Sequence, residues 1–236
     1  MTVDFKGKFF IFNPKSYLYG EHLLGMARVA DQLALDYPDI AVVLTCPYAD
    51  LYRVTSQTQH VIVCAQHLDG IEPGRGMGAV LADSLYAAGA RATFLNHAEH
   101  PLSSAQLVAS VKRAHDLGMA TIVCADSLAE ARALSLLEPT IMLCEPTELI
   151  GTGKTSDDDY MAMTNQAVKA LSPHTLIMQG AGIMTPEDVY RAIRSGADGT
   201  GCTSGIVKAP NPAQMLKDMV AAVDRAMKGG LEDGSL

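Results

Sequence analysis

The chain has 236 residues, of which 48% are hydrophobic and 19% are charged, so it can bury a large core. The 18 basic and 26 acidic residues leave a net charge of -8, which argues against nucleic acid or an anionic membrane as a partner. No apolar run reaches the roughly 18 residues of a membrane span, and the first residues lack the layout of a signal peptide.

The cysteines show no paired spacing typical of a zinc site or a redox motif. They are Cys46, Cys64, Cys124, Cys144 and Cys202. Most of them fall at or just past the ends of predicted strands, where a small buried side chain is the ordinary role of cysteine. We therefore expect reduced thiols, no metal site and a cytoplasmic location.

Short β-like runs alternate with longer helical patterns along the whole chain, in eight units. The predicted strands are Lys8 to Phe12, Ile40 to Thr45, His60 to Ala65, Ala90 to Leu95, Met119 to Cys124, Pro139 to Leu143, Thr175 to Gln179 and Asp198 to Cys202. Several are almost wholly apolar, as parallel strands covered on both faces are. Between them, apolar residues recur at a spacing of three and four, as from Leu23 to Leu33 and from Met215 to Val223.

Eight such units in one chain predict an α/β fold, a single (β/α)8 TIM barrel over residues 1–236, with residues from about 230 to 236 as a candidate flexible tail. A doubly wound open sheet is the alternative, because the pattern alone does not require the sheet to close.

The stretch from Leu143 to Thr155 is the most informative for function. Glu145 lies where a predicted strand ends, and the proline after it directs the chain away from the sheet. Gly151 and Gly153 flank a hydroxyl, an arrangement suited to backbone N–H groups that approach an anion. The segment predicts a catalytic base at a strand tip, followed by a lid that closes on a phosphate.

Other strand tips carry residues that suit the same chemistry. Asn13 and Lys15 follow the first predicted strand, and His97 and Glu99 follow the fourth. In a barrel these tips surround one mouth, so Lys15 and His97 are expected to face Glu145. A lone lysine or histidine is more often structural, and the shared rim is what favours a catalytic role.

The last two strands are followed by glycine-rich turns. Gly180 and Gly182 follow the seventh strand, and Ser204 and Gly205 follow the eighth. Glycines there let backbone N–H groups reach an anion, and barrels commonly bind a phosphate at this position. Glycine turns by themselves are weak evidence, because many connections contain a glycine for steric reasons.

Taken together, these motifs resemble those of triosephosphate isomerase, most closely its compact archaeal-type branch. The motifs are Asn13-Pro14-Lys15, Asn96-His97-Ala98-Glu99, Glu145-Pro146, Ile150-Gly151-Thr152-Gly153-Lys154-Thr155 and Ser204-Gly205-Ile206-Val207-Lys208-Ala209. The resemblance implies Glu145 as catalytic base, His97 as electrophile, Lys15 and Asn13 as substrate binders, and Glu99 as a supporting carboxylate.

The resemblance also implies a cofactor-independent aldose-ketose isomerase of glycolysis and gluconeogenesis, which interconverts dihydroxyacetone phosphate and glyceraldehyde 3-phosphate through an enediolate. The alternatives are an isomerase of a four-carbon or modified sugar phosphate and a barrel that binds a phosphorylated metabolite without turnover. Three positions differ from the family pattern: Pro14 replaces an aromatic residue, Ala98 a serine and Pro101 an arginine. All three border the expected substrate pocket.

The segment from His67 to Met77 is longer and less regular than a minimal connection between a strand and a helix. In the family this loop reaches across a dimer interface. We therefore expect a homo-oligomer, either a tetramer or a dimer.

Overall fold

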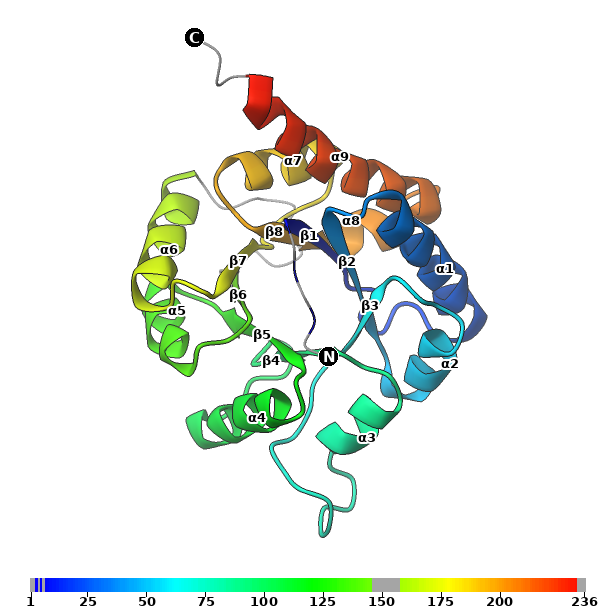
Figure 1. Cartoon of the computed structure of the whole chain (residues 1–236), viewed down its shortest axis with the longest axis vertical. Coiled ribbons are helices and arrows are strands. Elements are labelled where there is room, and N and C mark those ends of the chain that lie inside the picture. Colours follow the sequence, from blue (N-terminus) through cyan, green and yellow to red (C-terminus); the bar gives the residue numbers. More distant parts are fainter. Residues whose placement is uncertain (1–2, 4, 6, 146–157, 233–236) are drawn as a thin grey trace.

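The computed structural model describes residues 3, 5, 7–145 and 158–232, and their eight strands form a closed parallel barrel in sequence order, surrounded by helices (Figure 1). The strands are β1 (Lys8–Phe12), β2 (Ile40–Cys46), β3 (Ile62–Ala65), β4 (Ala92–Leu95), β5 (Ala120–Ala125), β6 (Ile141–Cys144), β7 (Leu176–Gln179) and β8 (Gly199–Cys202). Because β1 pairs with both β2 and β8, the sheet has no edge and the open-sheet alternative is excluded. All eight predicted strands are present, with ends shifted by at most two residues.

The helices follow the strands in the predicted alternation. They are α1 (Gly20–Asp36), η1 (Tyr48–Asp50), α2 (Leu51–Thr55), α3 (Ala82–Ala87), α4 (Ser104–Asp116), α5 (Leu128–Leu134), η2 (Ser135–Leu137), α6 (Asp158–Leu171), α7 (Pro186–Arg194), α8 (Ser204–Val207) and α9 (Pro212–Glu232). The final helix continues into the range predicted as a tail. None of the helices in the described part of the chain is long and apolar enough to cross a membrane.

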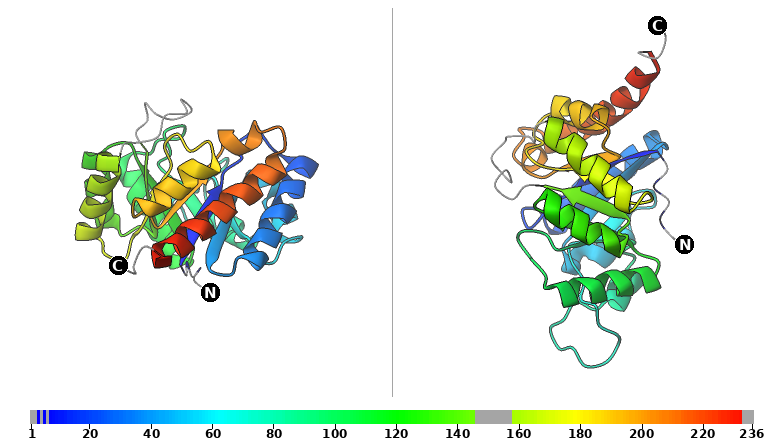
Figure 2. Two further views of the ribbon diagram at one scale, coloured as in Figure 1. Left: turned by 90° about the horizontal axis from the view of Figure 1, so that it is seen from above. Right: turned by 90° about the vertical axis from the view of Figure 1, so that its left-hand side faces the viewer.

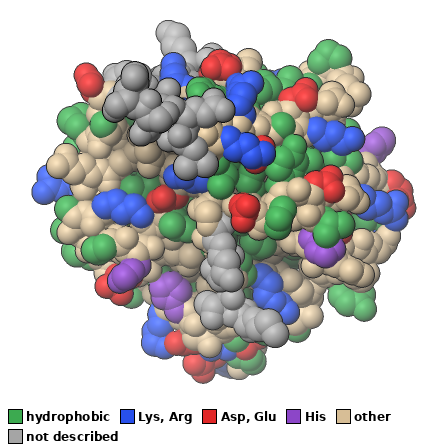
Figure 3. All heavy atoms as spheres, turned by 45° about the horizontal axis from the view of Figure 1, so that its top comes forward, with side chains coloured by type: hydrophobic (Ala, Val, Ile, Leu, Met, Phe, Trp, Pro, Cys, Tyr) green, Lys and Arg blue, Asp and Glu red, His purple; other side chains and the backbone are tan. Residues whose placement is uncertain are grey.

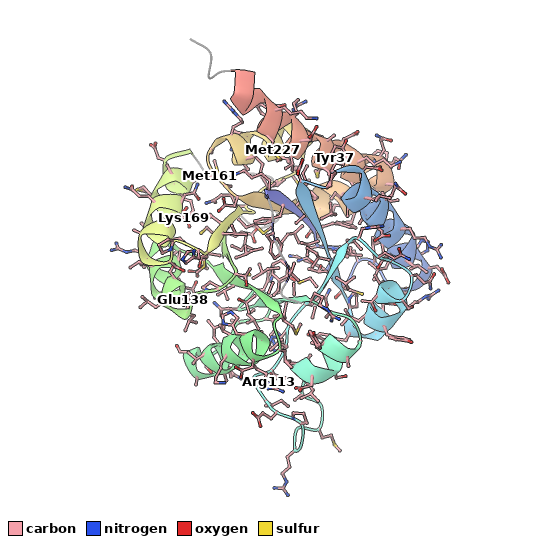
Figure 4. All side chains as sticks on the ribbon, in the orientation of Figure 1. Tyr37, Arg113, Glu138, Met161, Lys169 and Met227 are labelled. Atoms are coloured by element: carbon pink, nitrogen blue, oxygen red, sulfur yellow. The ribbon has the colours of Figure 1, made fainter. Side chains whose placement is uncertain are left out.

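Two apolar layers result from the alternation of side chains along each strand. Phe9 and Ile11 of β1 point into the barrel, whereas Phe10 and Phe12 pack outward against the helices. Figure 4 shows side chains filling the space inside the ring of strands. The barrel interior is therefore a packed core, and an active site must lie at one of its ends.

One glycine makes this interior possible. Gly199 is paired with Phe9 in the register of β8 and β1. A Cβ atom at Gly199 would lie 2.3 Å from the Phe9 ring, which is closer than any real contact. The missing side chain on β8 thus leaves the volume that the phenylalanine on β1 occupies.

The N-terminal end of the barrel is closed by the chain itself, because Val3 and Phe5 pack against the interior cluster. The loop of residues 66–81, between β3 and α3, extends away from the barrel on one side (Figures 1 and 2). On the face drawn in Figure 3, acidic and basic side chains are interspersed among polar and apolar ones.

Candidate active site

A pocket opens at the carboxyl ends of the strands, where most of the predicted site residues meet. It is lined by Ile11, Asn13, Lys15, Tyr17, Phe94, His97, Glu99, Leu143, Glu145, Met178, Gly180, Gly182, Ile183, Met184, Gly201, Cys202, Thr203 and Ser204. The predicted base, electrophile and lysine therefore share one cavity. Gly151 and Gly153, with the rest of the predicted lid, lie outside the described residues.

Lys15 is held in a strained backbone conformation. Its φ angle of 47° lies in the left-handed region, which is unusual for a residue with a side chain. The Lys15 amide donates to Asn13 Oδ1 at 3.0 Å, and Gln66 Nε2 donates to the Lys15 carbonyl at 2.8 Å. The Thr45 hydroxyl also donates to Asn13 Oδ1, at 2.6 Å. Asn13, predicted as a substrate binder, thus also fixes the direction of the lysine.

The Lys15 ammonium forms an ion pair with the Glu99 carboxylate, with 2.6 Å between Nζ and Oε1. The lysine side chain is 20% exposed and the glutamate side chain 61% exposed. Because Glu99 reaches into solvent, its energetic contribution is small, and its main effect is to orient the ammonium.

The hydrogen bonds of His97 determine which ring nitrogen carries a proton. The Glu99 amide donates to His97 Nδ1 at 3.1 Å, so Nδ1 acts as an acceptor and is unprotonated. Burial lowers the pKa of His97, and the positive charge of Lys15 lowers it further, while Glu99 opposes the shift. The imidazole is therefore neutral near pH 7 and has its single proton on Nε2.

Glu145 directly follows β6, and its amide donates to the Ala125 carbonyl at 3.0 Å. Burial raises the pKa of the Glu145 carboxyl, Lys15 opposes this shift and Glu99 adds to it. A Cβ atom on Gly180 would lie 3.7 Å from Glu145 Oε1 and 2.7 Å from Leu143 Cδ1. Gly180 thus leaves space beside a carboxylate whose basicity is increased by its surroundings.

The glycine turns after β7 and β8 lie next to each other. Gly182 has a φ angle of 69°, a conformation that glycine adopts without strain. A Cβ atom on Gly205 would lie 2.5 Å from the Met184 carbonyl oxygen, so the two turns pack at this point. Gly180, Gly182 and Ser204 line the pocket, whereas Gly205 lies behind it.

The sequence did not single out several residues that complete the site. The polar side chains of Tyr17 and Thr203 line the pocket, and Met178 and Met184 contribute apolar surface to it. Gln66 directly follows β3. Lys15 and Glu145 were predicted because they lie near the ends of strands, and the same criterion could have identified Gln66. The methionines could not have been found in this way, because nothing distinguishes them from core residues.

Comparison with known proteins identifies relatives of this arrangement. Residues 8–220 match the family model described as "Triosephosphate isomerase". The triosephosphate isomerase of Sulfurisphaera tokodaii is 34% identical over 223 residues, covering 91% of this chain and 96% of that protein. The enzyme of Methanobacterium bryantii is 32% identical over 218 residues, with 90% and 96% covered. That of Saccharolobus solfataricus is 32% identical over 221 residues, with 92% and 96% covered.

Proposed function

The chain belongs to the triosephosphate isomerase family and is an isomerase that interconverts dihydroxyacetone phosphate and glyceraldehyde 3-phosphate, and we propose that Glu145, His97 and Lys15 carry out this reaction. The observation that supports these roles is the shared pocket, in which a carboxylate of raised pKa faces a neutral imidazole and an ammonium. The family relationship favours the three-carbon substrate over the alternatives of a four-carbon sugar phosphate and a barrel without turnover.

Glu145 acts as the base that removes a proton from carbon. Such a proton is weakly acidic, so the base must be strong, and burial of the carboxylate provides this strength. The resulting enediolate develops negative charge on its oxygen atoms. The Lys15 ammonium and the Nε2–H of the neutral His97 stabilise that charge. Return of the proton from the Glu145 carboxyl to the neighbouring carbon, with transfer of a proton between the two oxygens, completes the isomerisation. One carbon is oxidised as its neighbour is reduced, so no external oxidant or reductant is needed, and the prediction that no cofactor takes part is retained on this chemical ground.

The substrate phosphate binds at the turns after β7 and β8. The backbone N–H groups of Gly180, Gly182 and Ser204 are the proposed donors, because they line the pocket and no side chain obstructs their approach at the glycines. Gly205 stays a proposed member of the phosphate site through the close packing of the two turns behind the pocket. Asn13 contributes from the end of β1, where its amide donates to the Cys202 carbonyl at the end of β8, and Glu99 supports the lysine. From the sequence, Gly151 and Gly153 belong to the same phosphate site.

A coupled assay of the purified protein over a panel of three- and four-carbon sugar phosphates tests the proposal. Turnover of dihydroxyacetone phosphate in deuterium oxide should place deuterium on the former carbonyl carbon, to which the proton is returned, because the acid form of a carboxyl base exchanges with solvent. His97→Gln and Lys15→Met should each reduce turnover by about two orders of magnitude or more. Full turnover in either variant would remove that residue from its role.

We propose that the protein is a homo-oligomer, a tetramer or a dimer, in which the loop of residues 66–81 binds a second copy. A hollow beside the catalytic pocket is lined by residues of four strand ends, namely Asn13, Lys15, Ser16, Tyr48, Gln66, His67, Phe94, His97, Glu99 and His100. Met77, near the tip of the extended loop, has a fully exposed side chain. The exposed apolar tip of the loop in one copy can therefore bind in the hollow beside the active site of a second copy.

A cytoplasmic location is also proposed. All five cysteines are free thiols with buried side chains, as is usual for proteins of a reducing compartment. Cell fractionation would test this directly, and recovery from a secreted fraction would contradict it.

A further inference from the structure

Asn96, at the end of β4, directly precedes the proposed electrophile and adopts a left-handed backbone conformation with φ of 59°. Within the described residues, only two other residues with a side chain have a positive φ, and one of them is Lys15. Asparagine tolerates this conformation better than most residues, yet it persists only where the surroundings enforce it. The turn at Asn96 determines the direction in which the chain enters His97.

The Asn96 side chain makes three hydrogen bonds that hold this turn. Its Nδ2 donates to the Cys124 carbonyl at 3.1 Å and to Glu130 Oε1 at 3.1 Å. Its Oδ1 accepts from the Leu102 amide at 3.1 Å. The amide thus uses both donor hydrogens, and its oxygen closes the ends of the loop that contains His97 and Glu99.

Glu130 anchors this amide from the neighbouring unit of the barrel. It lies in the first turn of α5, and its second oxygen, Oε2, accepts from the Asp126 amide at 2.8 Å. The Glu130 amide in turn donates to Ser127 Oγ at 3.2 Å. Oε1 therefore ties the start of α5 to the end of β4, and Oε2 ties it to the residue that follows β5.

In the described part of the chain, the partners of this partly buried carboxylate are the Asp126 amide, at the start of its own helix, and the Asn96 side chain. Glu130 has no lysine or arginine partner there, and it is not among the residues that line the catalytic pocket. Burial without a cation raises the pKa of Glu130 and is unfavourable for a charged group. A direct catalytic role is excluded by its position, and a role through Asn96 is what the hydrogen bonds allow.

We infer that Glu130 is a positioning residue for His97, which acts by holding the Asn96 amide and thereby the loop from His97 to Pro101. This inference rests on the proposed role of His97. The placement of a donor to within a fraction of an ångström governs its effect on a transition state, so loss of the anchor lowers turnover more than substrate binding.

The test uses the full chain with Glu130→Ala, which removes the acceptor, and Glu130→Asp, which keeps the charge but shortens the arm. Glu130→Gln keeps an oxygen acceptor at the same reach. Glu187→Ala is the matched control, because Glu187 lies in the first turn of α7 with an exposed side chain. For each variant, kcat and KM are measured for dihydroxyacetone phosphate, and the imidazole 15N shifts of His97 are recorded, assigned by their absence in His97→Gln.

We expect Glu130→Ala and Glu130→Asp to lower kcat by about tenfold, with KM within about twofold, and to shift the His97 nitrogen signals. Glu130→Gln should lower kcat less than Glu130→Ala does, because its oxygen can still accept from Asn96 although the acceptor for the Asp126 amide is lost. Glu187→Ala should stay within about twofold of the unaltered protein. If Glu130→Ala does not fold, Glu130→Asp and Asn96→Gly carry the test, since glycine keeps the left-handed turn but removes all three hydrogen bonds.

Unchanged His97 signals in both Glu130→Asp and Asn96→Gly would overturn the inference. Shifted signals with unchanged kcat would overturn it as well, because the anchor would then have no consequence for the reaction. Full turnover in His97→Gln would instead refute the proposed role of His97. That result would be independent of what the Glu130 variants show.

Discussion

At the scale of single residues, the site depends on three charges that alter one another. Lys15 lowers the pKa of both Glu145 and His97, whereas Glu99 raises both. Burial adds to the shift of each group in the direction that favours its neutral form. The proposed base, Glu145, is thereby made stronger while the His97 imidazole is kept neutral, which is the combination that proton abstraction and oxyanion stabilisation require.

Replacement of Glu145 by glutamine should lower kcat by about three orders of magnitude, because the base is lost while the shape of the pocket is kept. The same change should raise the unfolding free energy at about pH 7. Because the pKa of Glu145 is raised in the folded state, the fold favours the protonated carboxyl. The stability that the protonated carboxyl contributes is present at low pH and is lost as the pH rises through the folded-state pKa. Glutamine stays neutral at every pH and therefore avoids this loss.

Chemical denaturation at about pH 7 and at about pH 4 separates these effects, because the stabilisation by Glu145→Gln should largely disappear at the lower pH. Glu187→Gln, at an exposed site, is the control and should change neither kcat nor stability. Near-normal turnover of Glu145→Gln would remove Glu145 from its role as base.

The pH dependence of kcat/KM gives a second prediction. The proposed mechanism needs the Glu145 carboxylate, so activity should fall as the pH decreases through a pKa above its ordinary value of 4.5. Because the Glu99 charge raises that pKa, Glu99→Gln should move the acidic limb of the profile to lower pH. Profiles of the unaltered protein and of Glu99→Gln, measured side by side, check the sign. A shift to higher pH would contradict this prediction. It would show that Lys15, once released from its ion pair with Glu99, moves away from Glu145 and no longer lowers the pKa of that carboxyl.

At the scale of elements, the pairing of β1 with β8 depends on the space at Gly199. Gly199→Ala should lower the unfolding free energy by about 1–3 kcal/mol, because its Cβ atom would overlap the Phe9 ring. Urea denaturation measures the loss. Gly25→Ala in α1 is the control, since nothing lies within 4 Å of its Cβ position and alanine favours a helix.

A double variant identifies the cause of that loss. Phe9→Leu removes part of the ring that Gly199→Ala would strike, so the combined loss should be smaller than the sum of the two single losses. Strict additivity would show that the glycine serves the backbone of β8 and not the volume of Phe9.

At the scale of the whole molecule, the extended loop is the feature that the barrel itself does not require. Met77→Asp should shift the mass measured by light scattering toward the monomer, because a charge is costly at a buried contact between copies. Turnover should fall by about tenfold, since the hollow proposed to receive the loop shares Lys15 and His97 with the active site.

Leu35→Asp serves as the control for this change, because Leu35 is a half-exposed apolar residue on α1. It should keep the mass and activity of the unaltered protein. A monomeric unaltered protein with full activity would contradict the proposed assembly.

The sequence by itself determined the number and order of the strands and the residues at their tips. Both follow from local chemistry: a buried strand is an apolar run of limited length, and the residue after it must leave the sheet. Glu145, His97 and Lys15 were predicted in this way, because parallel strands bring their carboxyl ends to one rim. The family resemblance added their roles.

Only the tertiary structure decided which distant residues meet. Closure of the barrel, the pairing of Phe9 with Gly199 and the contact of Gln66 with the Lys15 carbonyl join positions that no local pattern relates. The bond from Asn96 to Glu130 spans 34 positions, and each residue alone reads as an ordinary turn or helix residue. Periodicity encodes which face of an element is buried, whereas a hydrogen bond between elements depends on register, and register becomes fixed only when the barrel closes.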